Sequence, residues 1–202
     1  MTLHPMTKRK KTMTKKNETK KNTAKQNKTT ENDALYYRAV KLKLYGLIAN
    51  WGQFASETWL PILLDCEETE RRKRSLERRF KDARIGAFKP ISDFEWKHPK
   101  KIDRRLIDEL FTFDFFADSA NVILLGPNGI GKTMIAKNLA HQAVTRGHTV
   151  RFISASQMLN ELASQDSANL LTKRLRKYAT LAMLVLDEVG YLSYDSRYAD
   201  LL

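Results

Sequence analysis

Apolar and polar positions follow three different patterns along the chain, and these patterns divide it into three parts. Residues 1–33 consist mostly of Lys, Thr and Asn and contain very few apolar side chains. Such a segment buries too little apolar surface to offset its ordering entropy, so we predict a disordered tail. Residues 34–100 have apolar positions at roughly helical spacing, whereas residues 101–202 alternate short apolar runs with helical stretches. We therefore predict a helical region and a linker between the tail and an α/β domain.

The middle part predicts two helices. Apolar side chains recur at helical spacing over residues 33–50, which predicts one helix there. Pro61 suits the first turn of a second helix, which would run to about residue 84, with Gly86 able to end it. Residues 89–101 include two prolines, and we expect an extended linker.

The pattern of residues 101–202 predicts helices that alternate with apolar strands. A short helix is predicted over residues 103–111. The predicted strands cover residues 122–125, 150–153 and 182–186, and the helices between them cover residues 132–146, 156–165 (with Ser156 as the N-cap) and 170–178. Alternation of this kind predicts a parallel sheet.

The loop after the first predicted strand matches the phosphate-binding pattern G-x-x-x-x-G-K-[ST] in full. Its residues, all predicted to bind ATP, are Gly126, Pro127, Asn128, Gly129, Ile130, Gly131, Lys132 and Thr133. The glycines allow the chain to curl so that successive N–H groups point at a phosphate, and the following helix directs its N-terminus there. We predict that Lys132 reaches the β- and γ-phosphates and that the Thr133 hydroxyl ligates Mg²⁺.

A second constellation follows the third predicted strand. Four apolar residues lead into Asp187 and Glu188, which lie 55 and 56 residues after Lys132. The carboxyl ends of parallel strands are where ligands bind in open α/β sheets. We predict that Asp187 holds the magnesium ion and that Glu188 is the general base that orients an attacking water. The predicted catalytic pair is therefore Lys132 and Glu188.

Basic side chains are concentrated in the second predicted helix and in the tail. The net charge is +13, of which the tail contributes an excess of seven positive charges. Five helix residues are predicted to contact DNA phosphates: Arg71, Arg72, Arg74, Arg78 and Arg79. The alternative is a solvated helix whose arginines pair with upstream acids, since Glu67, Glu68 and Glu70 lie within i,i+4 reach.

The cysteine content and the lack of a long apolar segment bear on where the protein is located. Cys66 is the only cysteine, so no disulfide can form within the chain. The chain has no run of 18 apolar residues, and no apolar segment follows its charged start. We therefore predict a cytoplasmic protein with no membrane partner.

Several segments together resemble the IstB-like transposition helper ATPases. They are the basic segment of residues 70–80, Asp93-Phe94 after a proline, the apolar lead-in of residues 121–125, the GPNGIGKT loop and LDEVGYL at residues 186–192. That family belongs to the AAA+ class and is similar to the DnaC-like helicase loaders. The resemblance implies an AAA+-like P-loop NTPase, with ATP and Mg²⁺ as cofactors. It also implies contacts between basic surfaces and double-stranded DNA, self-assembly along the duplex, and recruitment of a transposase.

The resemblance also sets an expectation for the end of the chain. Family members continue with two further strands, a polar sensor residue and arginines that complete a neighbouring site, whereas this chain stops about 15 residues after Asp187. We expect a C-terminally truncated domain whose P-loop strand and Asp-Glu strand lack the strand between them. ATP hydrolysis therefore stays an open question at this point. A helicase loader and a non-catalytic DNA-binding adaptor remain alternatives to the transposition helper.

Overall fold

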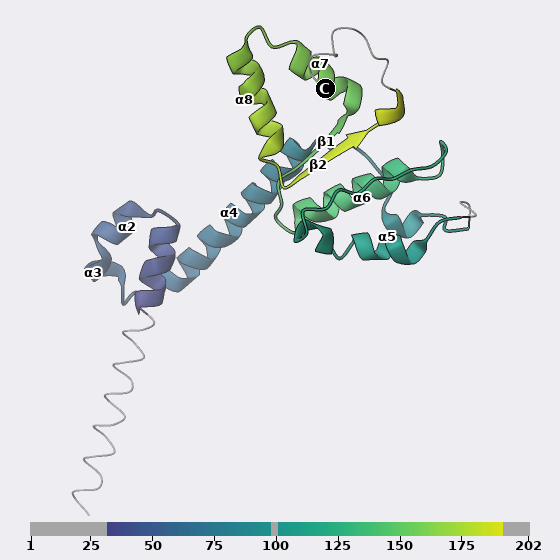
Figure 1. The fold of residues 1–202 in the computed structure, drawn as a ribbon. Coiled ribbons are helices and arrows are strands. Elements are labelled where there is room, and N and C mark those ends of the chain that lie inside the picture. The colour runs from purple at the N-terminus through teal and green to yellow at the C-terminus, as the bar shows by residue number, and fades with distance from the viewer. Residues whose placement is uncertain (1–31, 98–100, 192–202) are drawn as a thin grey trace, which may run out of the picture. The chain divides into compact units, whose positions relative to one another are not determined.

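A computed structural model describes residues 32–97 and 101–191 (Figure 1). The predicted tail of residues 1–33 lies almost wholly outside the described residues. The chain divides into two compact units, Met1–Lys73 and Arg74–Leu202. The division falls inside helix α4 (Leu60–Ala83), so residues 74–97 belong with the P-loop segment rather than with the preceding helices.

The first unit is a small helical cluster. Residues 32–41 are helical, and α2 (Tyr45–Ala49), α3 (Trp51–Phe54) and the first turns of α4 follow. Its core consists of five buried residues: Leu35, Ala39, Leu42, Leu60 and Leu64. Arg38 ties the first helix to α4 through ion pairs with Asp65 and Glu68. Arg38 donates to Glu68, which holds the pKa of that carboxyl below its usual value.

The single helix predicted over residues 33–50 is interrupted, which corrects that expectation. The Leu44 N–H donates to the Ala39 carbonyl and the Lys43 N–H to the Val40 carbonyl. These two bonds, with Lys43 in the left-handed conformation at φ 55°, form the Schellman motif that ends many helices. Apolar spacing continues across the break because both halves face the same core, so periodicity alone did not reveal it.

The second unit places helices on both sides of two parallel strands (Figure 1). Its elements are η1 (Ile91–Asp93), α5 (Arg104–Leu110), η2 (Asp114–Phe116), α6 (Lys132–Thr145), β1 (Val150–Ser154), α7 (Ala155–Ala163), α8 (Ala168–Ala179), β2 (Met183–Asp187) and η3 (Val189–Tyr191). The strands pair from Val150 opposite Met183 to Ser154 opposite Asp187. This confirms the predicted parallel α/β arrangement. Helix α6 packs against both strands, and α7 packs against β1.

The core of this unit forms around the inner face of α6. The helix buries Ile135, Leu139 and Val144 against β1 and against residues that precede the P-loop. Burial of a side chain of this size contributes about 1.5–3 kcal/mol, so this face fixes the helix that starts at the loop. The loop is therefore anchored at its C-terminal side by the best-packed helix of the unit.

Two expectations for this unit were wrong. Residues 122–125 form no strand: Ile123 and Leu125 are 76% and 86% exposed, and the segment pairs with neither β1 nor β2. An apolar run forms a strand only when a neighbour satisfies its N–H and C=O groups, and none does so among the described residues. The N-cap of α7 is Ser154 rather than Ser156, because Ser154 has the extended backbone of a cap and accepts from the Gln157 N–H.

Candidate nucleotide-binding site

The P-loop curls immediately before α6. Gly129 and Gly131 have φ values of 80° and 91°, in the left-handed region that favours glycine. Gly131 is also the N-cap of α6, which begins at Lys132, so the loop leads directly onto the N-terminus of a 14-residue helix. Helix N-termini attract anions through their free N–H groups and the helix dipole. The backbone therefore fits a bound phosphate chain.

Gly131 has a second reason to lack a side chain. A Cβ built there would lie 2.4 Å from Cε2 of Phe94, whose side chain is only 7% exposed. Phe94 belongs to the segment that the sequence predicted to be an extended linker. That segment contains the 3-10 helix η1 and packs directly on the P-loop. It therefore supports the loop of the candidate site from behind.

Asn138 holds the same segment to α6. Its side-chain oxygen accepts from the Ile91 N–H at 2.9 Å, and its nitrogen donates to the carbonyls of Lys89 at 2.9 Å and Met134 at 2.8 Å. Asn138 is the one buried polar residue among those that the structure describes. A polar residue three positions after Ile135, on the apolar face of α6, was the signal in the sequence, and sequence reasoning missed it.

The Lys132 ammonium group lies folded back over the loop. Its Nζ donates to the carbonyls of Gly126 at 2.7 Å and Pro127 at 2.6 Å. A lysine ammonium has three donors and is a compact point charge. The ammonium group therefore lies against the backbone of the loop and could donate to phosphate oxygens there.

Two predicted magnesium ligands meet although they are far apart in the sequence. The Thr133 hydroxyl donates to Asp187 Oδ1 at 3.3 Å, joining the first turn of α6 to the end of β2. Magnesium prefers oxygen ligands and is often held by one or two protein groups together with phosphates and water. The two side chains fit such an ion.

Glu188 follows Asp187 and has an unusual backbone. Its φ is 60°, and its N–H donates to Asp187 Oδ1 at 3.0 Å. Left-handed conformations are uncommon for a residue other than glycine and often occur at functional sites. The side chain is exposed at the same strand end as Asp187, which leaves its carboxylate accessible to water.

A large hollow separates the apolar lead-in from β2. Residues 121–126 line one side and residues 182–190 the other, and the cavity volume is about 1740 Å³. Pockets for small ligands are typically about 300–1,000 Å³. The hollow therefore exceeds what a nucleotide fills, and its apolar wall includes Ile123 and Leu125.

The five arginines of α4 that were predicted to contact DNA differ in their exposure and in their partners. Arg71 pairs with Glu67 and Arg72 with Glu68, both at 3.1 Å, as the ion-pair alternative predicted. Arg74 and Arg78 are exposed. Arg79 is half-buried and donates to the Ser75 hydroxyl at 2.9 Å, and its Nε is buried without a partner among the described residues. Ion pairing and phosphate contact are not exclusive, because exposed pairs contribute only about 0–1 kcal/mol.

Comparison with known proteins identifies the family. The sequence pattern of the family described as "IstB-like ATP binding protein" matches residues 39–202. The chain belongs to the IstB-like ATP-binding family. Its P-loop and the Thr133–Asp187 contact therefore lie within a domain of nucleotide-binding proteins.

Individual IstB-like relatives come from bacterial insertion sequences. One, described as an ATP-binding protein of insertion sequence IS5376 from Geobacillus stearothermophilus, is 35% identical over 140 residues, which cover 69% of this chain and 56% of the relative. Another, from insertion sequence IS21 of Pseudomonas aeruginosa, is 36% identical over 143 residues, covering 71% and 54%. The chain thus spans about half the length of the curated relatives it matches.

Over residues 32–97 and 101–191, no helix combines the length and apolar character needed to cross a bilayer.

Proposed function

We propose that the chain is an ATP- and magnesium-binding helper protein of a DNA transposition system, and that it binds double-stranded DNA and assists a transposase in the cytoplasm. The observation that carries the proposal is the convergence of Lys132, Thr133 and Asp187 around the P-loop. Membership of the IstB-like family and relatives from insertion sequences support the biological setting.

Each site residue has a distinct proposed role. The loop N–H groups and Lys132 bind the phosphates, and Thr133 with Asp187 holds the magnesium ion. Glu188 accepts a proton from water aligned at the end of β2. Bound ATP would drive self-assembly along DNA.

Nucleotide binding is tested by Lys132→Ala, with Lys173→Ala as the control. Lys173 is an exposed lysine on α8, outside the loop. A fluorescent ATP analogue titrated in the presence of magnesium should bind the control as well as the parent. Lys132→Ala should lose at least tenfold in affinity, which corresponds to about 1.4 kcal/mol. Equal affinity in all three proteins would remove the loop from the proposal.

DNA binding is tested by its dependence on salt. Each phosphate contact contributes about −0.9 to the slope of log K against log salt. Deletion of residues 1–33 should flatten that slope without abolishing binding, and Arg74→Glu with Arg78→Glu should flatten it further. Affinity for duplex DNA that ignores salt would contradict an electrostatic contact.

A non-catalytic DNA-binding adaptor is the second candidate function. It is favoured by residues 121–125, which pair with no strand among the described residues and so leave the start of the P-loop without a strand to hold it. Phosphate release measured with and without duplex DNA separates the two. DNA-stimulated turnover that Glu188→Gln abolishes supports the ATPase, whereas background release together with intact DNA binding supports the adaptor. A helicase loader shares these motifs, and the insertion-sequence relatives favour the transposition helper over it.

A further inference from the structure

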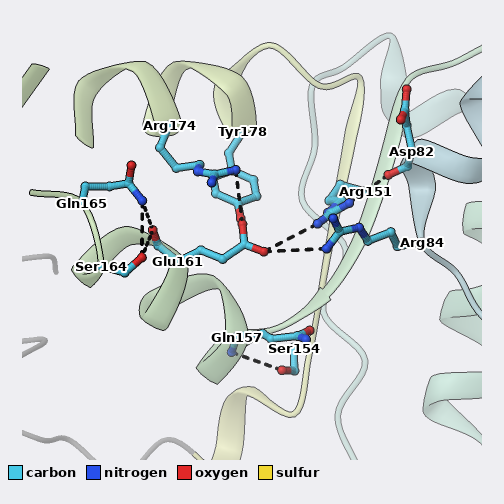
Figure 2. A network of polar contacts seen from close by, with 10 residues as sticks. All are labelled: Asp82, Arg84, Arg151, Ser154, Gln157, Glu161, Ser164, Gln165, Arg174 and Tyr178. Carbon is cyan, nitrogen blue, oxygen red and sulfur yellow. Dashed lines mark hydrogen bonds and ion pairs between the residues drawn. The ribbon is translucent and has the colours of Figure 1, made fainter. Parts of the chain in front are cut away.

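A cluster of arginines surrounds a single carboxylate on the far side of β1 from α6 (Figure 2). Glu161 of α7 accepts a hydrogen bond from the Tyr178 hydroxyl at 2.6 Å. Its carboxylate oxygens lie 3.6 Å from Arg174, 3.7 Å from Arg151 and 3.9 Å from Arg84. The side chains come from the end of α4, from β1 and from α8, all within the second unit.

The charges of this cluster do not balance. Three guanidinium groups face one carboxylate, which leaves an excess of two positive charges. Tyr178 adds no negative charge, because burial and the bond to Glu161 raise its pKa to about 12. Burial lowers the pKa of Arg151, and repulsion from the neighbouring Arg84 lowers it further. An added anion would relieve that repulsion.

Two of the arginines have N–H donors that remain available to a ligand. Arg151 is only 15% exposed in its side chain and donates to the Asp82 carbonyl at 3.1 Å, so it is a structural member of the cluster. The Arg84 and Arg174 side chains are 64% and 34% exposed, and within the described residues each guanidinium makes its ion pair to Glu161 but no hydrogen bond. A guanidinium carries five donors in a fork that suits phosphate.

The backbone conformation of Arg84 also indicates that its side chain has a role. It follows the last residue of α4 with φ 50°, at the left-handed position after a helix where glycine is the usual residue. An arginine there is strained, and the strain is tolerated where a side chain is required. The position therefore retains a side chain that makes a long ion pair, at 3.9 Å, to Glu161.

A row of cations leads along α4 to this cluster. Arg78, Lys81 and Arg84 follow one another every three residues, and all three are exposed. Residues three apart are neighbours on a helix surface. One small anion would need one or two of these groups, whereas a polyanion with regularly spaced phosphates engages the whole row.

We propose that Arg84 and Arg174 bind backbone phosphates of double-stranded DNA, held in position by Glu161 and Arg151. The site extends the basic face of α4 onto α8 and makes no contact with bases, so it contributes affinity without sequence preference. This inference rests on the DNA-binding part of the proposed function.

The experiment compares two double variants of the full chain. Arg84→Gly with Arg174→Ala removes the proposed contacts, and Lys101→Ala with Arg105→Ala removes two exposed charges elsewhere in the same unit. Binding of a random-sequence duplex is titrated over a range of salt concentrations. Each lost phosphate contact should reduce affinity about eightfold at 0.1 M salt and flatten the slope by about 0.9. The control pair should retain the parent's slope.

Folding is controlled by the single variant Arg84→Gly. Glycine relieves the left-handed strain, so its melting temperature should remain close to that of the parent while its DNA affinity falls. Inorganic phosphate is added to the parent at constant ionic strength as a further arm. Weak competition supports a polynucleotide site, whereas displacement of DNA at low millimolar phosphate would overturn the assignment in favour of a free-phosphate site.

The outcomes separate this inference from the function on which it rests. A parent that binds duplex DNA, beside an Arg84/Arg174 variant with the same affinity and slope, refutes the inference and leaves the proposed function intact. A parent that binds no duplex DNA refutes the DNA-binding function itself, and the phosphate site with it.

Discussion

Asn138 offers the sharpest test of how the segment before the P-loop contributes to the site. In Asn138→Ala the Ile91 N–H loses its acceptor and the Lys89 carbonyl loses its donor. The Met134 carbonyl is a normal helix acceptor within α6, so its loss is minor. A buried group left without a partner costs about 1–3 kcal/mol, and Lys89 is exposed enough for water to replace its bond. We therefore expect a loss of about 2 kcal/mol.

That loss should lower the melting temperature, speed hydrogen exchange at Ile91 and weaken nucleotide binding at the P-loop. One kcal/mol shifts the melting temperature by about 2–8 °C, depending on the size of the domain, so Asn138→Ala should melt several degrees below the parent. Gln142→Ala, a half-buried polar residue on the same helix, is the matched control. Hydrogen exchange should show faster exchange of the Ile91 amide in Asn138→Ala alone. Because Phe94 packs on Gly131, nucleotide affinity should fall as well.

Two results would refute this reasoning. Unchanged exchange at Ile91 would mean that Asn138 does not hold the segment. Faster exchange at Ile91 with unchanged nucleotide affinity would mean that the segment packs on the loop without supporting it.

Three further predictions concern other parts of the second unit. Gly131→Ala should weaken nucleotide binding by at least tenfold, since the new methyl group meets an aromatic ring at 2.4 Å and the φ of 91° is strained; intact affinity in a nucleotide titration would contradict the geometry. Val150→Ala should lower the free energy of unfolding in urea by about 1–3 kcal/mol, because Val150 is only 3% exposed. Ile123→Ala should change that free energy by less than about 0.5 kcal/mol, because Ile123 is 76% exposed. Similar losses in the two variants would place Ile123 in a core. The Tyr178 hydroxyl lowers the pKa of Glu161, so the stability that this carboxylate contributes is present above its unfolded value of about 4.5 and is lost as pH falls through the lower folded value. Tyr178→Phe should therefore be less stable than the parent at neutral pH and should lose less stability as pH falls below about 4.5, and equal losses over the acid range would count against the contact.

The features that the sequence determined by itself are those encoded over a few neighbouring residues. The P-loop, the helix that begins at Lys132 and the strand that ends at Asp187 were all predicted within one or two residues. Their signals are local: a glycine pattern that permits the loop, a helical repeat, and an apolar run followed by acids. Parallel pairing of β1 and β2 followed from the alternation of strands with helices. The meeting of Thr133 with Asp187 joins the first turn of α6 to the carboxyl end of β2.

Tertiary structure alone decided the features that depend on a partner far away in the sequence. Residues 122–125 have the composition of a strand, yet a strand needs a neighbour for its backbone, and no local pattern reports whether one is present. Residues 89–101 were expected to be an extended linker, but Asn138 and Gly131 contact Lys89, Ile91 and Phe94 and so hold the first part of that segment in place. The arginines around Glu161 come from segments up to 90 residues apart and acquire their shared role only when α4, β1, α7 and α8 pack together, as Figure 2 shows. Local propensity specifies the elements, whereas long-range packing specifies which polar groups meet.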